Sequence, residues 1–558
     1  MKISLRRDAR KRVMRPSTVA IAALLATGVQ AFELDTGNPD MSVRFDNTIK
    51  ASAIYRLHDA DPALVNSTRL LVPGVAASAF PQALNFNAGN DNFRSKGFVS
   101  ERIDLLSELD VVYRKRYGFR VSAAASHDAA YSRSTHATDV VNGQTPFNEF
   151  SSYTREQAGR SAEVLDAFAF AGWDIGESSK LNVRLGKHAL VYGESLFFGD
   201  NGIARSQGPM NVQKLLSSPN AQFKEIIVPV PQVSAQLQVS SALSLGAYYQ
   251  FGWEADRMPA GGSYFSVANN NWGGSTFPEL VGTNLLLPGT DQKAKDSGQF
   301  GLQLKWRKDE TDLGFYAARY HDKAGQFYSK LNVTSPAPGS WYYVFPENIT
   351  TVGASASQTV GDTNFAVEAS VRNNMPLVNS NIVYPNVMAA PDYAKGHTGH
   401  VNFSWLATFG PNALAKESSL IGELAWNRVL SSTDPAKHLD ATRTRDASAI
   451  QFIYSPSYRQ VLPGLDISIP LGLRYVIDGN SSITGLGWGP KGSGSATLGL
   501  EGTYQGVWQF TVGYTHFIGK AEPFVDYRPL QTGGTPTYSS GNTLADRNYL
   551  AFSLRRTF

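Results

Sequence analysis

The chain ends with the stretch NYLAFSLRRTF, residues 548–558. Leu550, Phe552 and Leu554 occupy alternate positions and share their parity with the terminal Phe558. Small or polar side chains stand at most of the positions between them. Because successive residues of a β-strand face opposite sides, this segment predicts a strand with one apolar face. Such a strand fits either a soluble β-sandwich or the closing strand of a transmembrane barrel.

The same alternation recurs along the whole chain, and its length favours the barrel. The runs extend over about ten to twelve residues, the length that a tilted strand needs to cross a membrane. Strands of soluble proteins average about five to six residues. Aromatic residues stand near the ends of many runs, as at a membrane interface. The connections between the runs alternate between short and long.

We therefore expect an all-β fold, a transmembrane antiparallel β-barrel with long extracellular loops and short periplasmic turns. About eighteen strands are expected, with sixteen as the next alternative, because an even number returns both termini to the periplasm. The expected strands cover residues 42–56, 98–113, 119–131, 163–174, 180–191, 225–239, 242–253, 298–307, 312–321, 348–360, 364–374, 398–408, 418–429, 447–457, 466–476, 495–504, 506–518 and 547–558.

Residues 1–31 predict a secretory signal peptide, which leaves residues 32–558 as one barrel domain. Seven basic residues and one acidic residue precede the apolar stretch VAIAALLATGV (19–29), and VQA follows, with cleavage expected after Ala31. This apolar stretch is too short to span a bilayer as a helix. Without the leader, the formal charge of +4 becomes slightly negative, so the composition gives no support to nucleic-acid binding.

The residue content excludes several classes of site. The chain has no cysteine, which rules out disulfides, thiolate metal sites and cysteine catalysis. Ser195 lies in GESLF, which lacks the second glycine of a nucleophile elbow, so a structural role is expected. His397 and His400 are three apart, which on a strand places them on opposite faces. We therefore expect no catalytic residues, no metal site and no cofactor, and interpret the chain as a transport protein and not an enzyme.

Two basic residues interrupt the expected outward apolar faces. Arg556 shares the parity of Phe558 but lies at the strand end, where exposing an arginine to lipid costs only about 0–1 kcal/mol. Lys187 shares the parity of Leu181 and Val183 and is expected to lie deeper, which a local β-bulge would accommodate.

Four segments resemble a known protein family. One pattern is similar to that of the proteobacterial outer-membrane barrels grouped as domain of unknown function 1302. Its residues are Gly186, Lys187, Tyr192, Gly193, Glu194 and Ser195. Tyr192 stands where tryptophan is expected, and His188 stands where glutamine is expected. The resemblance extends over about residues 32–558 and implies an outer-membrane barrel, often encoded beside machinery for lipophilic compounds. The segments are SERIDLLSELDV (100–111), LDAFAFAGWDI (165–175), RLGKHALVYGESLFF (184–198) and QFGWEADRMPAGGSYF (250–265).

Charged residues of both signs alternate with the apolar face and are expected to point into the lumen. They can form a ladder of ion pairs that makes the barrel rigid, which we favour, or a field that orients polar or ionised solutes. The candidates are Arg44, Asp46, Lys50, Arg102, Asp104, Glu108, Asp110, Arg120, Arg184, Glu368, Arg372, Glu423 and Arg474.

Several long connections are unusually apolar for segments that face water. They either fold into the barrel as a plug or pack together as an outer cap. Whether they form a plug or a cap, their apolar side chains serve either as a small core for the loops or as a capture site for a lipophilic solute. The candidates for this apolar mouth or plug are Leu70, Leu71, Phe80, Phe197, Phe198, Phe277, Leu285, Leu286, Trp341 and Tyr342.

The expected function is a bacterial outer-membrane channel for a lipophilic or amphipathic small molecule. A substrate-selective porin for small polar or anionic solutes is the alternative, and an outer-membrane component of a lipid-export complex is a further one. Loop apolarity favours the first, and lumen charge favours the second. The expected partners are outer-membrane lipid, the assembly machinery, which reads Phe558, and the solute. The sequence does not give the oligomeric state.

Overall fold

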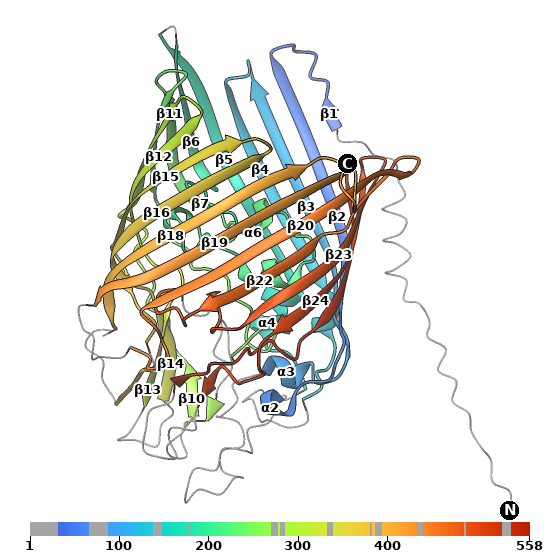
Figure 1. Cartoon of the computed structure of the whole chain (residues 1–558), viewed down its shortest axis with the longest axis vertical. Coiled ribbons are helices and arrows are strands. Elements are labelled where there is room, and N and C mark those ends of the chain that lie inside the picture. The colour runs from blue at the N-terminus through green and yellow to red at the C-terminus, as the bar shows by residue number, and fades with distance from the viewer. Residues whose placement is uncertain are drawn as a thin grey trace, which may run out of the picture.

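The computed structural model describes residues 32–65, 88–137, 148–176, 178–268, 277–278, 285–331, 339–379, 382–385, 393–432, 439–484, 487–526 and 537–558. Its main sheet is antiparallel throughout and closes on itself, because the last strand pairs with β2. This sheet contains twenty strand segments. One is the short β1, and two, β21 and β22, form a single strand interrupted around Pro470, so the barrel has eighteen strands. Figure 1 shows the tilted strands of the barrel wall.

The barrel strands follow the chain order, and each pairs with its neighbour in sequence. They are β2 (Met41–Arg56), β3 (Gly97–Tyr113), β4 (Tyr117–Asp128), β5 (Arg160–Ile175), β6 (Ser179–His188), β7 (Val230–Gln238), β8 (Leu243–Gln250), β11 (Gln299–Lys308), β12 (Thr311–Tyr320), β15 (Ile349–Val360), β16 (Thr363–Pro376), β18 (Lys395–Phe409), β19 (Glu417–Ser432), β20 (Asp446–Leu462), β21 (Leu465–Ser468) with β22 (Leu471–Asp478), β23 (Gly494–Tyr504), β24 (Trp508–Ile518) and β27 (Tyr549–Thr557).

The expected eighteen strands are thus confirmed, with shifts at a few ends. The strand expected from residue 225 begins at Val230, because Phe223–Ile226 forms the short helix α6, which a capping box of Gln222 and Glu225 stabilises. The strand expected to end at residue 191 ends at His188. Lys187 is therefore the last residue but one of β6, and its Nζ donates to the carbonyl of Val164, 2.8 Å away.

The bulge that accompanies Lys187 lies in the neighbouring strand. The register between β4 and β5 shifts between Val121 and Ala123, opposite Val164 and Ala167. The carbonyl of Val164 lies at this bulge and receives the ammonium group of Lys187. The bulge therefore supplies a polar partner on the outward face and leaves the register of β6 unchanged.

Both ends of the barrel seam are paired. β27 runs along β2 from Arg56–Tyr549 to Thr48–Thr557, and the backbones of Phe558 and Asn47 exchange two hydrogen bonds of 2.7 and 2.8 Å. Beyond this point β1 (Phe32–Leu34) pairs with the remaining part of β2. The edge of β2 is thus covered along most of its length. The C-terminus lies at the end of the barrel that carries the short turns (Figure 1).

The connections at the opposite end contain most of the small elements. A second sheet has the order β17 (Ile382–Pro385), β13 (Gln326–Leu331), β14 (Gly339–Val344), β10 (Leu285–Pro288) and β9 (Phe277–Pro278). Two short helices, α2 (Pro62–Val65) and α3 (Ala88–Asn92), lie at the same end (Figure 1). The other small elements are the 3-10 helices η2 (Ala129–Ser132) and η5 (Ile203–Ser206), the helices α4 (Ser152–Thr154) and α5 (Val212–Ser217), the π-helix η4 (Arg155–Gly159), and strands β25 (Val525–Asp526) and β26 (Thr537–Tyr538).

The two faces of the wall differ in burial. Along β2, every second residue from Asp46 to Arg56 is buried, although most of these side chains are polar. Large apolar side chains on the other face of the wall, such as Leu302 and Val352, stay exposed. The interior is thus polar and filled, and the outside carries an apolar surface. None of the described helices has the length and apolar character that a membrane-spanning helix needs.

Candidate functional site

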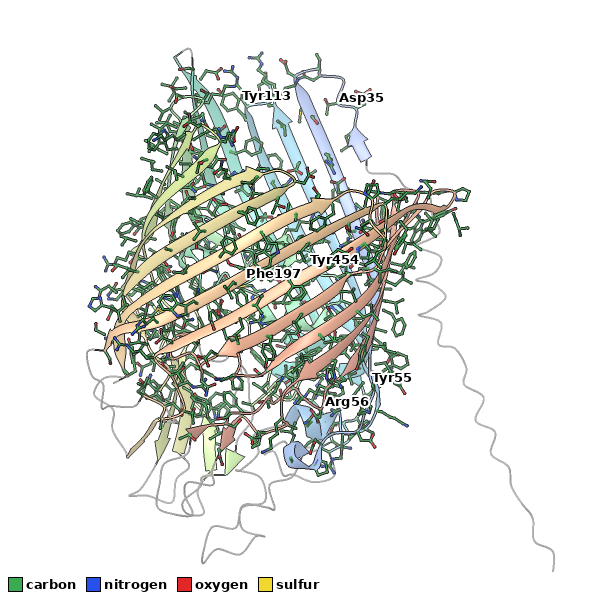
Figure 2. All side chains as sticks on the ribbon, in the orientation of Figure 1. Asp35, Tyr55, Arg56, Tyr113, Phe197 and Tyr454 are labelled. Atoms are coloured by element: carbon green, nitrogen blue, oxygen red, sulfur yellow. The ribbon has the colours of Figure 1, made fainter. Side chains whose placement is uncertain are left out.

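The connection between β6 and β7, residues 189–229, folds into the barrel, and we call it the infolded segment. Its residues form hydrogen bonds or ion pairs with strands on all sides of the wall, which is possible only from the interior. Figure 2 shows Phe197 of this segment behind the strands of the wall. The contacts reach Lys50 of β2, Glu108 of β3, Gln250 of β8, Lys305 of β11, Glu368 of β16, Asn402 of β18, Glu423 of β19 and Thr511 of β24.

Glu423 is the strongest anchor of the infolded segment. Its side chain is fully buried and accepts hydrogen bonds from the backbone N–H groups of Leu196 and Phe198 at 3.0 and 2.9 Å. It also accepts from the N–H of Phe197, from Ser195 Oγ at 2.8 Å and from Asn402 Nδ2 at 2.6 Å. Hydrogen bonds to an ionised acceptor are roughly twice as strong as neutral ones. The residues GESLFFG therefore wrap around one carboxylate.

A second pair of strand residues holds the next turn of the segment. Glu368 accepts from the N–H groups of Glu194 and Ile203 at 2.7 and 2.6 Å. Arg372 lies on the same face of β16 and donates to the carbonyls of Asn201 and Gly202 at 2.7 and 2.8 Å. The carboxylate of Glu368 thus accepts from backbone N–H groups, and the guanidinium of Arg372 donates to backbone carbonyls. These residues of β16 therefore bind the backbone of the segment and not its side chains.

The chain belongs to a known family. The family model described as "Protein of unknown function (DUF1302)" matches residues 13–558. The resemblance seen in the sequence is thereby confirmed. Of the residues that carry it, Gly186 and Lys187 lie in β6, and Tyr192–Ser195 lie in the infolded segment. A search of curated proteins finds no match.

Solved structures of outer-membrane channels share little more than the barrel with the DUF1302 chain. OccAB2 of Acinetobacter baumannii is 11% identical, with a TM-score of 0.40 over 92% of this chain and 98% of its own. OpdK of Pseudomonas aeruginosa is 10% identical, with a TM-score of 0.39 over the same shares. DcaP of Acinetobacter baumannii is 9% identical, with a TM-score of 0.36 over 95% and 100%. Similarity at this level transfers no solute to the DUF1302 barrel.

A polar network inside the DUF1302 barrel centres on Asn201. Its amide nitrogen donates to Asn402 Oδ1 at 2.8 Å, and its amide oxygen receives Asn427 Nδ2 at 3.1 Å and lies 2.9 Å from His400 Nδ1. His400 is buried, whereas His397 is exposed, so the two histidines share no site, as the sequence predicts. Among the described residues, no group of three His, Asp or Glu side chains has the arrangement of a metal site.

An ion-pair node connects the infolded segment to two loops of the outer end. Arg205 pairs with Asp256 at 2.6 Å and with Asp322 at 2.8 Å. Burial disfavours the guanidinium charge, but the two carboxylates raise the pKa of Arg205 above its ordinary value. Lys323 follows Asp322, and its Nζ donates to the carbonyls of Arg205 and His321, both at 3.4 Å. Burial lowers the pKa of Lys323 to about 7.

Most of the charged residues predicted for the lumen are buried by the infolded segment or paired across strands. Lys50 contacts Asp104 and Ser218, and Arg102 binds Asp104 with two nitrogens. Arg474 lies over the ring of Phe198, 5.3 Å from its centroid. The remaining pairs are Arg44 with Asp46, Arg120 with Asp110, and Glu108 with Lys224. Arg184 is exposed and lies over the ring of Phe168.

The apolar candidates divide between the infolded segment and the outer sheet. Phe198 is fully buried and packs on Trp488, with Phe197 against the same cluster. Trp341 and Tyr342 lie in β14, where they pack against the aromatic residues of β13. The others are not placed by side chain. Leu70, Leu71 and Phe80 lie outside the described residues, and for Phe277, Leu285 and Leu286 the structure describes only the backbone of β9 and β10.

The infolded segment also exposes large apolar side chains. Phe223 is 60% exposed, and Val191, Leu196 and Leu215 are each more than two-fifths exposed. Side chains of this kind normally pack inside a folded loop of this size. Here polar anchors from the wall hold the backbone of the segment, and these side chains stay accessible to solvent.

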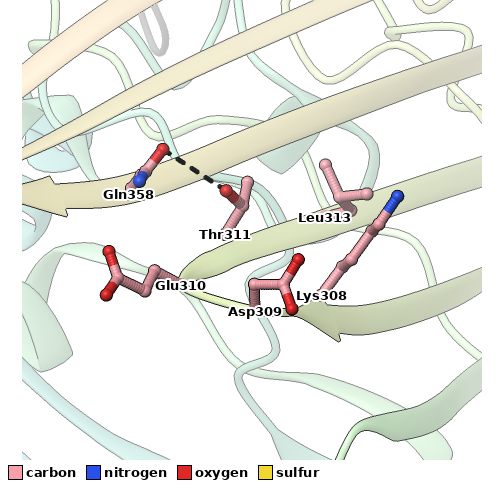
Figure 3. A pocket seen from close by; sticks show the side chains of 6 residues that line it. All are labelled: Lys308, Asp309, Glu310, Thr311, Leu313 and Gln358. Atoms are coloured by element: carbon pink, nitrogen blue, oxygen red, sulfur yellow. Dashed lines mark hydrogen bonds between the residues drawn. The ribbon is translucent and has the colours of Figure 1, made fainter.

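A separate concavity lies at the turn between β11 and β12 (Figure 3). It is lined by Lys308, Asp309, Glu310, Thr311, Leu313 and Gln358, and Thr311 Oγ1 donates to Gln358 Oε1 at 3.3 Å. Most of these residues are exposed at a short turn. We assign it no role in the passage of a solute.

Sequence reasoning missed two kinds of residue that hold the infolded segment. They are asparagines, which bond through their side-chain amides, and charged residues that connect the segment to the loops. Asn201, Arg205, Asn402 and Lys323 belong to no motif. Each of them has partners far away in the chain, up to 226 positions for Asn201 and Asn427. The one available signal is the stretch DNGIARSQG (200–208), which is polar and rich in glycine although it follows an apolar run.

Proposed function

We propose that the chain is a bacterial outer-membrane channel for lipophilic or amphipathic small molecules, with the infolded segment as its constriction. The closed barrel leaves no sheet edge unpaired, which is the condition for strands to stand in lipid. Outer-membrane lipid would contact the outward apolar surface, and the assembly machinery would insert the exported chain after removal of residues 1–31. The proposal includes no chemical step.

The observation that carries the proposal is the exposure of apolar side chains on the infolded segment. A constriction that selects small polar solutes uses rings of charged or polar groups. Here the infolded segment instead exposes the apolar side chains of Phe223, Leu196, Leu215 and Val191. Burying about 100 Å² of apolar solute surface against them contributes about 2.5 kcal/mol. This gain is enough to favour a hydrocarbon body and small enough to allow its release.

A selective porin for polar or anionic solutes is the second candidate, and the charged wall favours it. Arg44 and Arg120 stay partly exposed beside their carboxylates, and Arg184 is exposed. A field of this kind orients ionised solutes. A role in a lipid-export complex is the third candidate, but the short turns provide little surface for a partner.

The first test is uptake by cells that carry the protein, compared with cells that lack it, of a labelled lipophilic compound and a small sugar. Phe223→Asp and Leu196→Asp place a charge where the solute would contact hydrocarbon. We expect uptake of the lipophilic compound to fall about tenfold, because about 1.4 kcal/mol of contact energy corresponds to that factor. Uptake of the sugar should stay unchanged or rise.

The matched control is Leu414→Asp, because Leu414 is 65% exposed in the turn between β18 and β19 and lies outside the infolded segment. Phe223→Tyr, which keeps the ring, should behave like the natural protein. If only sugar uptake depends on the protein, and the two aspartates change nothing, the selective porin is the better account.

A further inference from the structure

Most partly exposed ion pairs of the interior differ in the exposure of their two members. In the pair Arg44–Asp46, the side chain of the cation is 62% exposed and that of the carboxylate 11%. Lys224 and Glu108 are 46% and 11% exposed. In each pair the carboxylate is the more buried member, and the cation is the member that solvent reaches more easily.

Two further pairs repeat this difference. Arg120 and Asp110 are 39% and 20% exposed, and Lys305 and Glu194 are 44% and 25% exposed. Arg257 and Glu163 are equal at 28%. Arg257 also pairs with Glu254, which is the more exposed member at 39% against 28%. Of these six partly exposed pairs, four thus present their positive member, one presents its negative member and one presents both equally.

The register of the strands places Arg44, Arg120 and Arg184 on one continuous part of the inner surface. Arg44 is opposite Asp110, and Asp110 is opposite Arg120. Arg120 is opposite Phe168, and the guanidinium of Arg184 lies 5.6 Å from the centroid of that ring. Cross-strand neighbours share one face of the sheet, so these residues line the interior across β2 to β6.

Arg184 strengthens the positive character of this surface. No carboxylate of the described residues lies within ion-pair distance of its guanidinium, which contacts the ring of Phe168 instead. Arg44, Arg120, Arg184 and Lys305 all stand within about five residues of a short turn, where their strands begin or end. The positive surface therefore lies between the infolded segment and the short-turn end of the barrel.

We infer that the passage is anion-selective and that its solute is an amphipathic anion, such as a medium-chain carboxylate. The charge part of this inference stands on the ion pairs alone, whereas the hydrocarbon part rests on the proposed function. Lys224 joins the two, because it is adjacent to the exposed Phe223 in α6. An anionic head would lie among the cations while its hydrocarbon body contacts the apolar side chains of the infolded segment. Because the carboxylates of these pairs are more buried than the cations, the cations attract the anionic head and the carboxylates repel it less.

The experiment measures the reversal potential of the purified protein in a planar bilayer under a gradient of potassium chloride. We expect chloride to permeate about three times more readily than potassium or better, since clefts lined by one sign of charge concentrate the opposite ion. Arg184→Gln and Lys305→Gln, alone and together, should move the ratio stepwise towards one. Arg459→Gln is the matched control, because Arg459 is 64% exposed near the end of β20, where it pairs with the exposed Glu417. Heat-modifiable migration on gels shows that each variant is folded.

A ratio of one or below, an absence of conductance, or unchanged ratios in both glutamine variants would overturn the inference. The second measurement compares cellular uptake of octanoate with octylammonium and with acetate. Preference for octanoate over octylammonium supports the charge part, and equal uptake of the two contradicts it. Preference for octanoate over acetate concerns the apolar part. If chloride selectivity holds but acetate and octanoate enter equally, the proposed function fails while the charge inference stands.

Discussion

Lys323 shows how one buried charge makes the outer end of the barrel sensitive to pH. It lies in the loop after β12, almost fully buried, with Nζ 5.1 Å from the centre of the Tyr320 ring. Burial lowers its pKa from 10.5 to about 7. Between these two values the unfolded chain binds a proton that the folded chain does not, so stability rises with pH in this window and is flat below it. We expect Lys323→Met to abolish this rise.

The measurement is the urea midpoint of the detergent-solubilised protein at pH 6, 8 and 9.5. At pH 6 the free energy of unfolding of the variant should exceed that of the natural protein by about 2 kcal/mol. This value is part of the full effect of the pKa difference, which amounts to about 1.4 kcal/mol per pH unit. The difference should shrink towards pH 9.5. Lys520→Met, at an exposed lysine, should leave the pH profile unchanged. A profile of Lys323→Met parallel to that of the natural protein would contradict the assignment.

The infolded segment is an element whose order depends on one carboxylate of the wall. Glu423 accepts five hydrogen bonds from the segment and from Asn402, and no cation is paired with it among the described residues. Glu423→Gln replaces an acceptor oxygen with a donor NH₂ group that faces other donors. We expect local opening to become easier by about 2–3 kcal/mol. Hydrogen exchange of the amides of residues 196–198 should accelerate by about thirtyfold or more.

The control for this prediction is Glu417→Gln at the short-turn end of β19, where Glu417 is exposed and pairs with Arg459. An exposed pair of this kind contributes about 0–1 kcal/mol, so exchange in the infolded segment should not change. Unchanged exchange at residues 196–198 in Glu423→Gln would show that other contacts hold the segment.

The whole barrel depends on closure between its first and last strands. β27 pairs with β2 over nine residues on one side and with β24 on the other. Removing residues 549–558 would leave β2 and β24 with unpaired backbone groups in lipid, each costing several kcal/mol. We expect the shortened chain to be lost from the outer membrane and to show no heat-modifiable migration. Deleting Phe558 alone removes only the two hydrogen bonds to Asn47, so membrane levels should fall less, and Phe558→Tyr should be milder still. Normal assembly without the last strand would refute closure by β27.

The wall of the barrel was predictable from the sequence because the pattern that specifies each strand lies within that strand. A strand that separates a polar interior from an apolar exterior must alternate at every second residue, and this period is visible in a single segment such as 548–558. Register follows from the same alternation together with the short turns. All eighteen strands could therefore be predicted from the sequence. The predicted start of one strand, residue 225, was wrong because the helix α6 lies there and β7 begins at Val230. The charged inward faces of β2, β3 and β16 followed from the same period.

The use of the interior was decided by the tertiary structure alone. An apolar connection is equally suited to a plug, an outer cap or a small core of its own, and only the closed wall shows that residues 189–229 fold inward while β13 and β14 form an outer sheet. Glu423 and Leu196 are 227 positions apart, and nothing local marks them as partners. The exposure of the two residues in an ion pair depends on which of them the infolded segment covers. Composition after the leader gives nearly equal numbers of positive and negative residues. Burial decides which sign the interior presents, because a charge acts on a solute only where water or the solute can reach it.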